Sequence, residues 1–252
     1  AGSMGDDTPV AVLSSHFRPV SHYFRQNFSQ VTNPPIDSLR ENKVMSLKTR
    51  FGNLGNILDF DNLTEENIYV LDSPILTNSQ FKKFKKFFSK KIKVIDCTFD
   101  IQNSLKDRIE AIREEVETAV REGSTCIVLS DKDFSSQKAS IPSILTVGAV
   151  HSHLVKHGLR GYCSLNVECS DAMDTHSFAI LIGVGATTVN PYLAIDSIYQ
   201  RFEKKLFGKS DFETCVAKFK KSIDAGLLKI MSKMGISVIS SYRGGCNFEA
   251  VG

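Results

Sequence analysis

The sequence predicts an α/β fold, with a mostly parallel open sheet or partial barrel flanked by helices and an extended N-terminal arm. From residue 92 onward, strand-like apolar runs alternate with helical runs, as in parallel strands joined by crossover helices. Between four and five strands are visible, too few to close an eight-stranded barrel. Residues 5–60 lack strong periodicity, and we expect them to form an N-terminal arm or linker region ahead of an α/β central domain over 61–252.

The first expected strand covers 92–99, with the sequence IKVIDCTF. A helix is predicted over 104–123, because an apolar stripe recurs at helical spacing between Ser104, a suitable N-cap, and Gly123, a suitable stop. The next strand is expected over 125–131, where the chain reads TCIVLSD.

The later elements follow the same alternation. They are expected to be a helix over 141–158, strands over 162–169 and 178–186, and a helix over 190–206. Pro142 falls near the first turn of one helix, and Asn190 is the expected N-cap of the other, with Pro191 at its first position. In the last helical run before Gly235, the apolar residues recur at helical spacing.

The composition is that of an ordinary soluble globular protein. Of 252 residues, 42% are hydrophobic and 23% charged, the net charge is +3, and no apolar run is long enough to span a bilayer. The six cysteines are widely spaced and form no CxxC pair, so we expect small core residues in a reducing compartment rather than metal ligands or disulfides. The start, AGSM over residues 1–4, resembles a tag remnant rather than a secretory signal.

A lysine-rich segment over 81–93 has the sequence FKKFKKFFSKKIK. Thr77 is a suitable N-cap, and Phe81, Phe84 and Phe88 recur at helical spacing, which leaves the lysines on the opposite face. This pattern favours a solvated amphipathic helix. A phosphate-backbone contact is the alternative, but we expect no nucleic-acid partner, because base-reading or stacking elements are not evident.

The stretch GVGATTV contains Gly183 and Gly185 after an apolar run. It partly resembles the glycine-rich turn that lets backbone amides approach a pyrophosphate. The third glycine is missing, as is an acidic residue about 20 positions later, so tight packing at the turn is favoured over dinucleotide binding.

Three histidines lie in HSHLVKH. His153 and His157 are four residues apart on one helix face and provide half of a metal site, whereas His151 points elsewhere. No carboxylate or cysteine at ligand spacing completes the set, so surface or capping histidines are favoured.

The loop SDKDFSSQ follows an expected strand at its carboxyl end, where open α/β sheets usually bind ligands. Asp131, Lys132 and Asp133 are therefore candidates for acid–base work, although no paired nucleophile is near in sequence. An ordinary polar loop is the competing interpretation.

Several motifs together resemble the central region of the glutamate synthase large subunit. In chain order they are TPVAVLSSHFRPVSHYFRQNFSQVTNPPIDSLRENKVMSL, LDSPILT, IPSILTVGAVHSHLVKHGLR, GVGATTVNPYLA and GLLKIMSKMGISVISSYRGGCNFEAVG. The resemblance is collinear from Thr8 to Gly252 and rests on several independent motifs, which makes it specific.

The resemblance implies one internal domain of a larger oxidoreductase. In that family an N-terminal amidotransferase domain releases ammonia from glutamine, and a barrel domain with FMN condenses it with 2-oxoglutarate to make glutamate. An iron–sulfur cluster and an NAD(P)H-oxidising subunit or ferredoxin supply the electrons. The resemblance thus implies no catalytic residue, cofactor or metal ligand in this chain, which we expect to be inactive alone and to end at a cloning boundary.

The resemblance also points to the segment QVTNPPID. The threonine and asparagine before the proline pair line the family's ammonia tunnel, and they correspond to Thr32 and Asn33. Pro34 and Pro35 offer no N–H groups and hold the segment in an extended shape, so they are candidates for a rigid tunnel wall. A rigid connector without a transport role remains the alternative.

The sequence departs from the family pattern near its end. Gly245, Cys246 and Asn247 stand where the family has alanine, glutamine and an apolar residue. Glycine loosens the backbone and asparagine weakens a packing contact, so the docking of this segment on the barrel domain is put in question.

Two other functions stay open from the sequence alone. One is a stand-alone α/β binding or scaffold module, and the other is a nucleotide-binding enzyme built on GVGATTV. We expect the protein in the cytoplasm, or in a plastid if it comes from a photosynthetic eukaryote, without a membrane partner.

Overall fold

The computed structural model describes residues 10–27, 34–51, 58 and 68–251, and all structural statements refer to these residues. Its centre is a four-stranded sheet in which every neighbouring pair is parallel and the strand order follows the chain. The strands are β4 (Ile92–Asp96), β6 (Cys126–Ser130), β8 (Ser164–Glu168) and β9 (Thr188–Asn190). This arrangement confirms the predicted α/β fold class.

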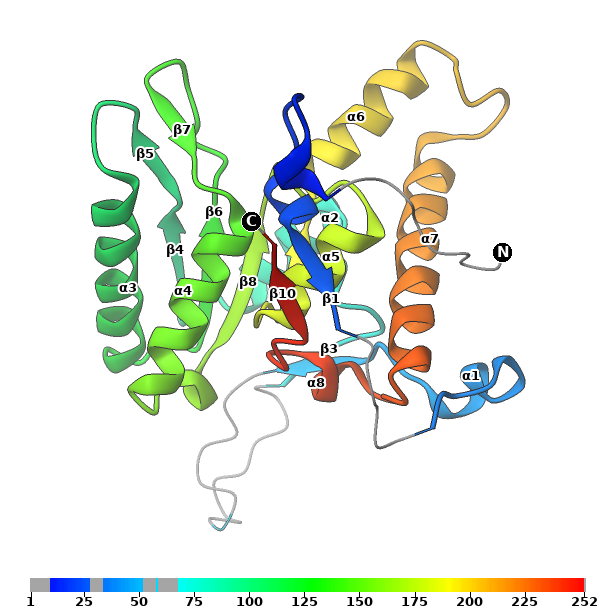
Figure 1. Ribbon diagram of the computed structural model, residues 1–252, viewed down its shortest axis with the longest axis horizontal. Coiled ribbons are helices and arrows are strands. Elements are labelled where there is room, and N and C mark those ends of the chain that lie inside the picture. The colour runs from blue at the N-terminus through cyan, green and yellow to red at the C-terminus, as the bar shows by residue number, and fades with distance from the viewer. Residues whose placement is uncertain (1–9, 28–33, 52–57, 59–67, 252) are drawn as a thin grey trace.

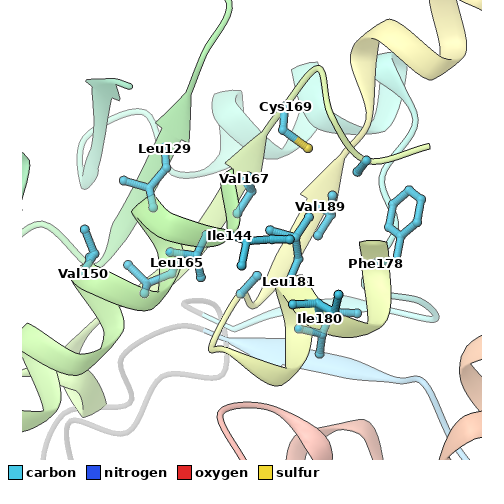
Figure 2. Close-up of a cluster of buried hydrophobic side chains, with 14 of the residues drawn as sticks. Leu129, Ile144, Val150, Leu165, Val167, Cys169, Phe178, Ile180, Leu181 and Val189 are labelled. Carbon is cyan, nitrogen blue, oxygen red and sulfur yellow. The ribbon is translucent and has the colours of Figure 1, made fainter. Parts of the chain in front are cut away.

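Helices alternate with these strands along the chain and pack on the sheet (Figure 1). They are α3 (Leu105–Arg121), α4 (Ser143–Lys156) and α5 (Thr175–Gly183). Ile127 and Leu129 of β6 point into the larger core with these helices, part of which Figure 2 shows. Cys126 and Val128 point to the other face, because alternate side chains of a strand face opposite ways.

The second face of the sheet is covered by α2 (Asn78–Phe87) and by the antiparallel pair β2 (Thr49–Phe51) and β3 (Tyr69–Leu71). Thr77 and Gln80 form a capping box at the start of α2, as the N-cap assignment predicted. The aromatic side chains Phe81, Phe84 and Phe88 are buried there, which confirms the predicted amphipathic helix.

The remaining elements complete the domain. They are α1 (Ser38–Val44), α6 (Tyr192–Glu203), α7 (Phe212–Lys233), α8 (Ile239–Tyr242), the pair β5 (Thr98–Asp100) and β7 (Lys138–Ser140), and the 3-10 turns η1 (Ala11–Leu13), η2 (Val20–Tyr23) and η4 (Arg160–Tyr162). Among the described helices none combines the length and the apolar character that crossing a bilayer requires.

The start and the end of the described chain pair with each other. Strand β1 (Phe24–Gln26) runs antiparallel to β10 (Phe248–Ala250), and Figure 1 shows the two lying side by side. The Nε2 atom of His176 on α5 lies 3.0 Å from the carbonyl oxygens of both Ser21 and Phe24, and its N–H donates to them. The described part of the arm is therefore fastened to the domain.

The expectation of a strand over 178–186 is wrong, because this run forms most of α5. Asp174 caps the helix by accepting a hydrogen bond from the backbone N–H of Ser177 at 2.8 Å. All residues from Ser177 to Gly183 are buried, so the helix is apolar on every side and shows no helical stripe. The fourth strand is instead the short β9.

Two boundaries also differ from expectation. The run 92–99 divides at Cys97 into β4 and the start of β5. Asn190 does not cap α6, since it ends β9 and its side-chain amide donates to the carbonyl of Leu76 at 2.9 Å. Pro191 occupies the N-cap position of α6.

Candidate functional site

The proline segment is the site that the sequence singles out. Thr32 and Asn33 lie outside the described residues, whereas Pro34 and Pro35 are described and exposed. Directly after them the N–H of Ile36 donates to the carbonyl of Ser232 on α7 at 2.8 Å. Asp37 then caps α1 through hydrogen bonds from two backbone N–H groups. The downstream end of the proline pair is thus fixed to the domain, and the rings themselves face outward.

A polar cluster lies at the carboxyl edge of the parallel sheet. Asp131, which directly follows β6, is only 2% exposed, although Lys132 and Asp133 beside it are exposed. Its Oδ2 atom accepts hydrogen bonds from the hydroxyl of Ser140 at 2.9 Å and from the N–H and hydroxyl of Ser170 at 3.0 and 2.5 Å. Asp131 therefore joins the end of β7 to the segment that follows β8.

Glu168 at the end of β8 is the second buried carboxylate of this edge. Its Oε2 accepts from the hydroxyl of Ser130 at 2.8 Å, and its Oε1 lies 3.5 Å from Nζ of Lys85 and 3.8 Å from Nζ of Lys132. The carboxylate thus joins β6, β8 and α2. Both oxygens of Glu168 are therefore engaged, whereas Oδ1 of Asp131 and the hydroxyl of Tyr192 are buried without a hydrogen-bond partner in the described structure.

Two further groups of the edge have perturbed pKa values. Burial raises the pKa of Tyr192, and the charge of Asp131 raises it further. Burial also raises the pKa of Asp171, whose carboxylate accepts a hydrogen bond from the N–H of Ser143 at 2.9 Å. The candidate acid–base loop is therefore part of a packed polar network.

The histidine pair has a partner that the sequence did not reveal. The Nε2 atom of His153 lies 2.6 Å from Oε2 of Glu117 on α3, and one ligand atom from each of Glu117, His153 and His157 lies within 4.8 Å of the others. No carboxylate stands at ligand spacing in the sequence, and Glu117 joins the pair only because it comes from the neighbouring helix. His151 lies elsewhere, with its Nδ1 accepting from Nε of Arg160 at 3.1 Å.

The glycines of GVGATTV pack against the end of the chain. The turn follows a helix rather than a strand, and the N–H of Cys246 donates to the carbonyl of Gly183 at 3.1 Å. A Cβ atom at Gly183 would collide with the ring of Phe248. Gly185 has φ +127°, which disfavours any residue with a side chain. These contacts agree with the favoured packing role.

Two arginines that the sequence did not single out, Arg160 and Arg243, line a cavity of about 250 Å³ near the start of β8. Arg160 donates to the carbonyls of Cys163 at 2.6 Å and Gly185 at 2.9 Å. Arg243 is different, because its buried Nε and Nη2 atoms have no hydrogen-bond partner in the described structure. Burial and the nearby charge of Arg160 lower the pKa of Arg243 to about 10.

Comparison with known proteins identifies the family. The family model described as "Glutamate synthase central domain" matches residues 1–252. The chain is 56% identical to the glutamate synthase [NADPH] large chain of Azospirillum brasilense and 42% identical to that of Bacillus subtilis, and both alignments cover 100% of this chain. It is 40% identical to the ferredoxin-dependent glutamate synthase of Pyropia yezoensis over 99% of its length.

The alignments cover only a small part of these relatives, namely 17%, 16% and 17% of their lengths in the same order. The similarity nevertheless extends along nearly the whole of this chain. The chain belongs to the glutamate synthase central domain family.

Proposed function

We propose that this chain is the central, non-catalytic domain of a glutamate synthase and that it links an amidotransferase domain to an FMN-bearing barrel domain of the same polypeptide. The parent enzyme makes glutamate from glutamine and 2-oxoglutarate. Family membership is the observation that carries this proposal. Relatives named NADPH-dependent and ferredoxin-dependent both match, so the electron donor is either an NAD(P)H-oxidising subunit or ferredoxin.

The pairing of β1 with β10 supports the linking role. Residues from the early and the late part of the described chain are held in one ribbon, with Phe24 opposite Ala250 and Gln26 opposite Phe248. The chain therefore enters β1 and leaves β10 at the same end of this ribbon. His176 adds a second attachment for the arm, so the ribbon is coupled to the core through α5.

The cofactors of the parent enzyme belong, in this proposal, to its other parts. FMN is the group that the family's barrel domain would bind. An iron–sulfur cluster needs several cysteines at one place. In this chain, five of the six thiols are buried, Cys246 is exposed, and the one gathering of metal-ligating side chains among the described residues contains no cysteine. These residues do not fit a cluster.

The finer part of the proposal is that the segment 30–37 forms a wall of the ammonia tunnel. Pro34 and Pro35 lack N–H groups and restrict their own φ angles, so the segment stays stiff without hydrogen-bonding its own backbone amides. The attachment of Ile36 to α7 and the cap at Asp37 fix its downstream end. In a tunnel wall, backbone carbonyls would accept hydrogen bonds from ammonia, while an apolar bore would exclude ammonium.

The test uses the full-length enzyme with Asn33→Leu or Pro34→Gly. Glutamate formation is measured once with glutamine and once with added ammonia. We expect the glutamine-driven rate to fall while the ammonia-driven rate stays near that of the parent, because added ammonia enters without passing the tunnel. Equal loss in both assays, or no loss in either, refutes the tunnel role and leaves the rigid-connector interpretation.

We place the parent enzyme in the cytoplasm, or in a plastid for a photosynthetic eukaryote. The spinach relative carries the word chloroplastic in its name, which supports the second location for that lineage. Fractionation of the source cells, followed by detection of the chain, tests this assignment.

A further inference from the structure

The interface between α3 and α4 brings three metal-ligating side chains together on the outer side of the domain. His153 and His157 stand one helical turn apart on α4, and their rings lie 4.2 Å apart between centroids. Glu117 reaches them from α3. We propose that Glu117, His153 and His157 bind a divalent transition-metal ion, for which zinc is the best match.

The donor set indicates the class of metal. Two imidazoles and one carboxylate are one of the protein ligand sets found in three-ligand zinc sites, in which a water molecule takes the fourth position. Imidazole suits zinc, copper, iron and nickel, whereas magnesium and calcium prefer oxygen ligands alone. We therefore exclude magnesium and calcium as occupants.

The geometry requires only side-chain movement. Around a tetrahedral zinc ion with bonds of about 2.0 to 2.1 Å, ligand atoms lie roughly 3.3 Å apart. The present ligand atoms lie within 4.8 Å of one another, and the closest pair, Glu117 and His153, is at 2.6 Å. The ion would replace that hydrogen bond. The Nδ1 atom of His157 is 2.8 Å from the carbonyl of His153, and an ion bound at Nε2 would leave this hydrogen bond in place.

The scaffold holds the ligands in place and leaves them accessible. The inner faces of the two helices are buried in the core through Ile112, Val116, Val150 and Leu154, so their backbones cannot easily separate. The side chains of His153 and Glu117 keep 18% and 21% of their surface exposed, and His157 is exposed. An ion can therefore arrive from solvent.

A neighbouring arginine orients the carboxylate. Arg121 donates from Nε and Nη2 to Oε1 of Glu117, both at 2.8 Å. This leaves Oε2 directed at His153, as outer hydrogen bonds commonly orient metal ligands. Arg121 and His153 hold the pKa of Glu117 below its usual range, so the carboxylate is ionised at neutral pH. A bound ion would clamp α3 to α4.

The experiment titrates the 252-residue chain, without a polyhistidine tag, with Zn²⁺ in a calorimeter and with Co²⁺ in a spectrophotometer. All measurements use a Cys246→Ser background, because Cys246 is the one exposed thiol of the six. The test variants are His153→Gln, His157→Gln and Glu117→Gln. His16→Gln is the matched control, since His16 is exposed and far along the chain from the cluster.

We expect one Zn²⁺ per chain and the visible absorption of tetrahedral Co²⁺. Each ligand substitution should weaken binding at least about tenfold, the lower bound for losing even an outer-shell partner, while His16→Gln leaves it unchanged. His157→Gln keeps the test valid if another variant misfolds, since His157 lies at the exposed helix end. Absence of saturable binding, or equal affinity in His157→Gln and His16→Gln, overturns the proposal.

Discussion

Two arginines that line one cavity should respond in opposite directions to the same substitution. Arg160→Met and Arg243→Met each remove one positive charge and leave a side chain of similar length. Arg160 has three close partners, namely Nδ1 of His151 and the carbonyls of Cys163 and Gly185. Arg243 has two buried nitrogen atoms, Nε and Nη2, with no partner in the described structure.

The expected changes in the free energy of unfolding follow from these contacts. Hydrogen bonds to a charged group contribute about 1.5 to 3 kcal/mol each, so Arg160→Met, which removes the two to carbonyls, should lower the free energy of unfolding by at least about 3 kcal/mol. A buried polar group without a partner costs about 1 to 3 kcal/mol. Arg243→Met should therefore raise the free energy of unfolding by about 1 to 3 kcal/mol.

The pH dependence gives a second readout. The pKa of Arg243 falls from 12.5 to about 10 on folding, mainly because of burial and then because of Arg160. Below pH 10 the guanidinium is charged in both states, and the full penalty is present. Between those two values only the unfolded state is charged, so the gain from Arg243→Met should shrink as the pH rises above 10.

The assay is urea unfolding of the chain at pH 7.5, with the slope of each transition checked for equality among variants. A higher midpoint for Arg243→Met and a lower one for Arg160→Met are expected. If both substitutions lower the midpoint by similar amounts, the inference that the two unpartnered nitrogen atoms of Arg243 destabilise the folded chain is refuted.

Three further predictions use stability and thiol chemistry. Gly226→Ala should destabilise the chain by about 1 to 3 kcal/mol in urea unfolding, because the new Cβ would collide with Thr175 where α7 packs on α5. The control is Gly148→Ala on α4, whose Cβ would meet nothing within 4 Å, so this substitution should be neutral or stabilising. Asp174→Ala should cost about 1 kcal/mol at pH 7. Burial acts to raise the pKa of Asp174, but hydrogen bonds from Ser177 outweigh burial and lower the pKa below 3.8. The stability that the Asp174 carboxylate contributes should therefore vanish as the pH falls through its pKa in the folded state. An equal cost of Asp174→Ala at pH 2 and pH 7 would contradict this prediction. Burial raises the pKa of Cys126 to about 12 and that of Cys163 to about 11. A thiol reagent at pH 8 should therefore modify only the exposed Cys246 rapidly, and Cys246→Ser should abolish this rapid phase of the reaction. Persistence of the rapid phase in Cys246→Ser would contradict the prediction.

The sequence was sufficient to predict those helices that have a clear apolar period or a clear capping residue. The predicted N-cap Ser104 and the predicted stop Gly123 lie next to the two ends of α3. The Ser104 hydroxyl accepts a hydrogen bond from the N–H of Asp107 at 3.3 Å, and Gly123 has a positive φ. The stripe of α2 was also visible, because one face is aromatic and the other basic. Local patterns of this kind depend on neighbouring residues alone.

The error at 178–186 has a physical reason. A helix buried on every side shows no stripe, so a short apolar run is ambiguous between helix and strand. The N-cap pair of Asp174 and Ser177 was the local signal that would have decided for a helix. The length of the run could not decide between a helix and a strand, since nine residues suit either element.

Long-range partners could not be predicted from the sequence. Glu117 lies 36 residues before His153, and the two meet only because α3 packs on α4. The pairing of β1 with β10 joins opposite ends of the described chain. For Thr32 and Asn33 the resemblance alone supplied the assignment, and they lie outside the described residues. Their tunnel role therefore stays a prediction.

The most direct test of the central proposal is the release of free ammonia by the full-length enzyme during turnover with glutamine. Wild-type enzyme is compared with a Pro34→Gly, Pro35→Gly double variant, and ammonia in solution is counted per glutamine hydrolysed. A stiff tunnel wall predicts that the variant hydrolyses glutamine but loses ammonia to solvent, with less glutamate formed per glutamine. An unchanged ratio of glutamate to glutamine, without free ammonia, would contradict the proposal that this domain helps form the tunnel.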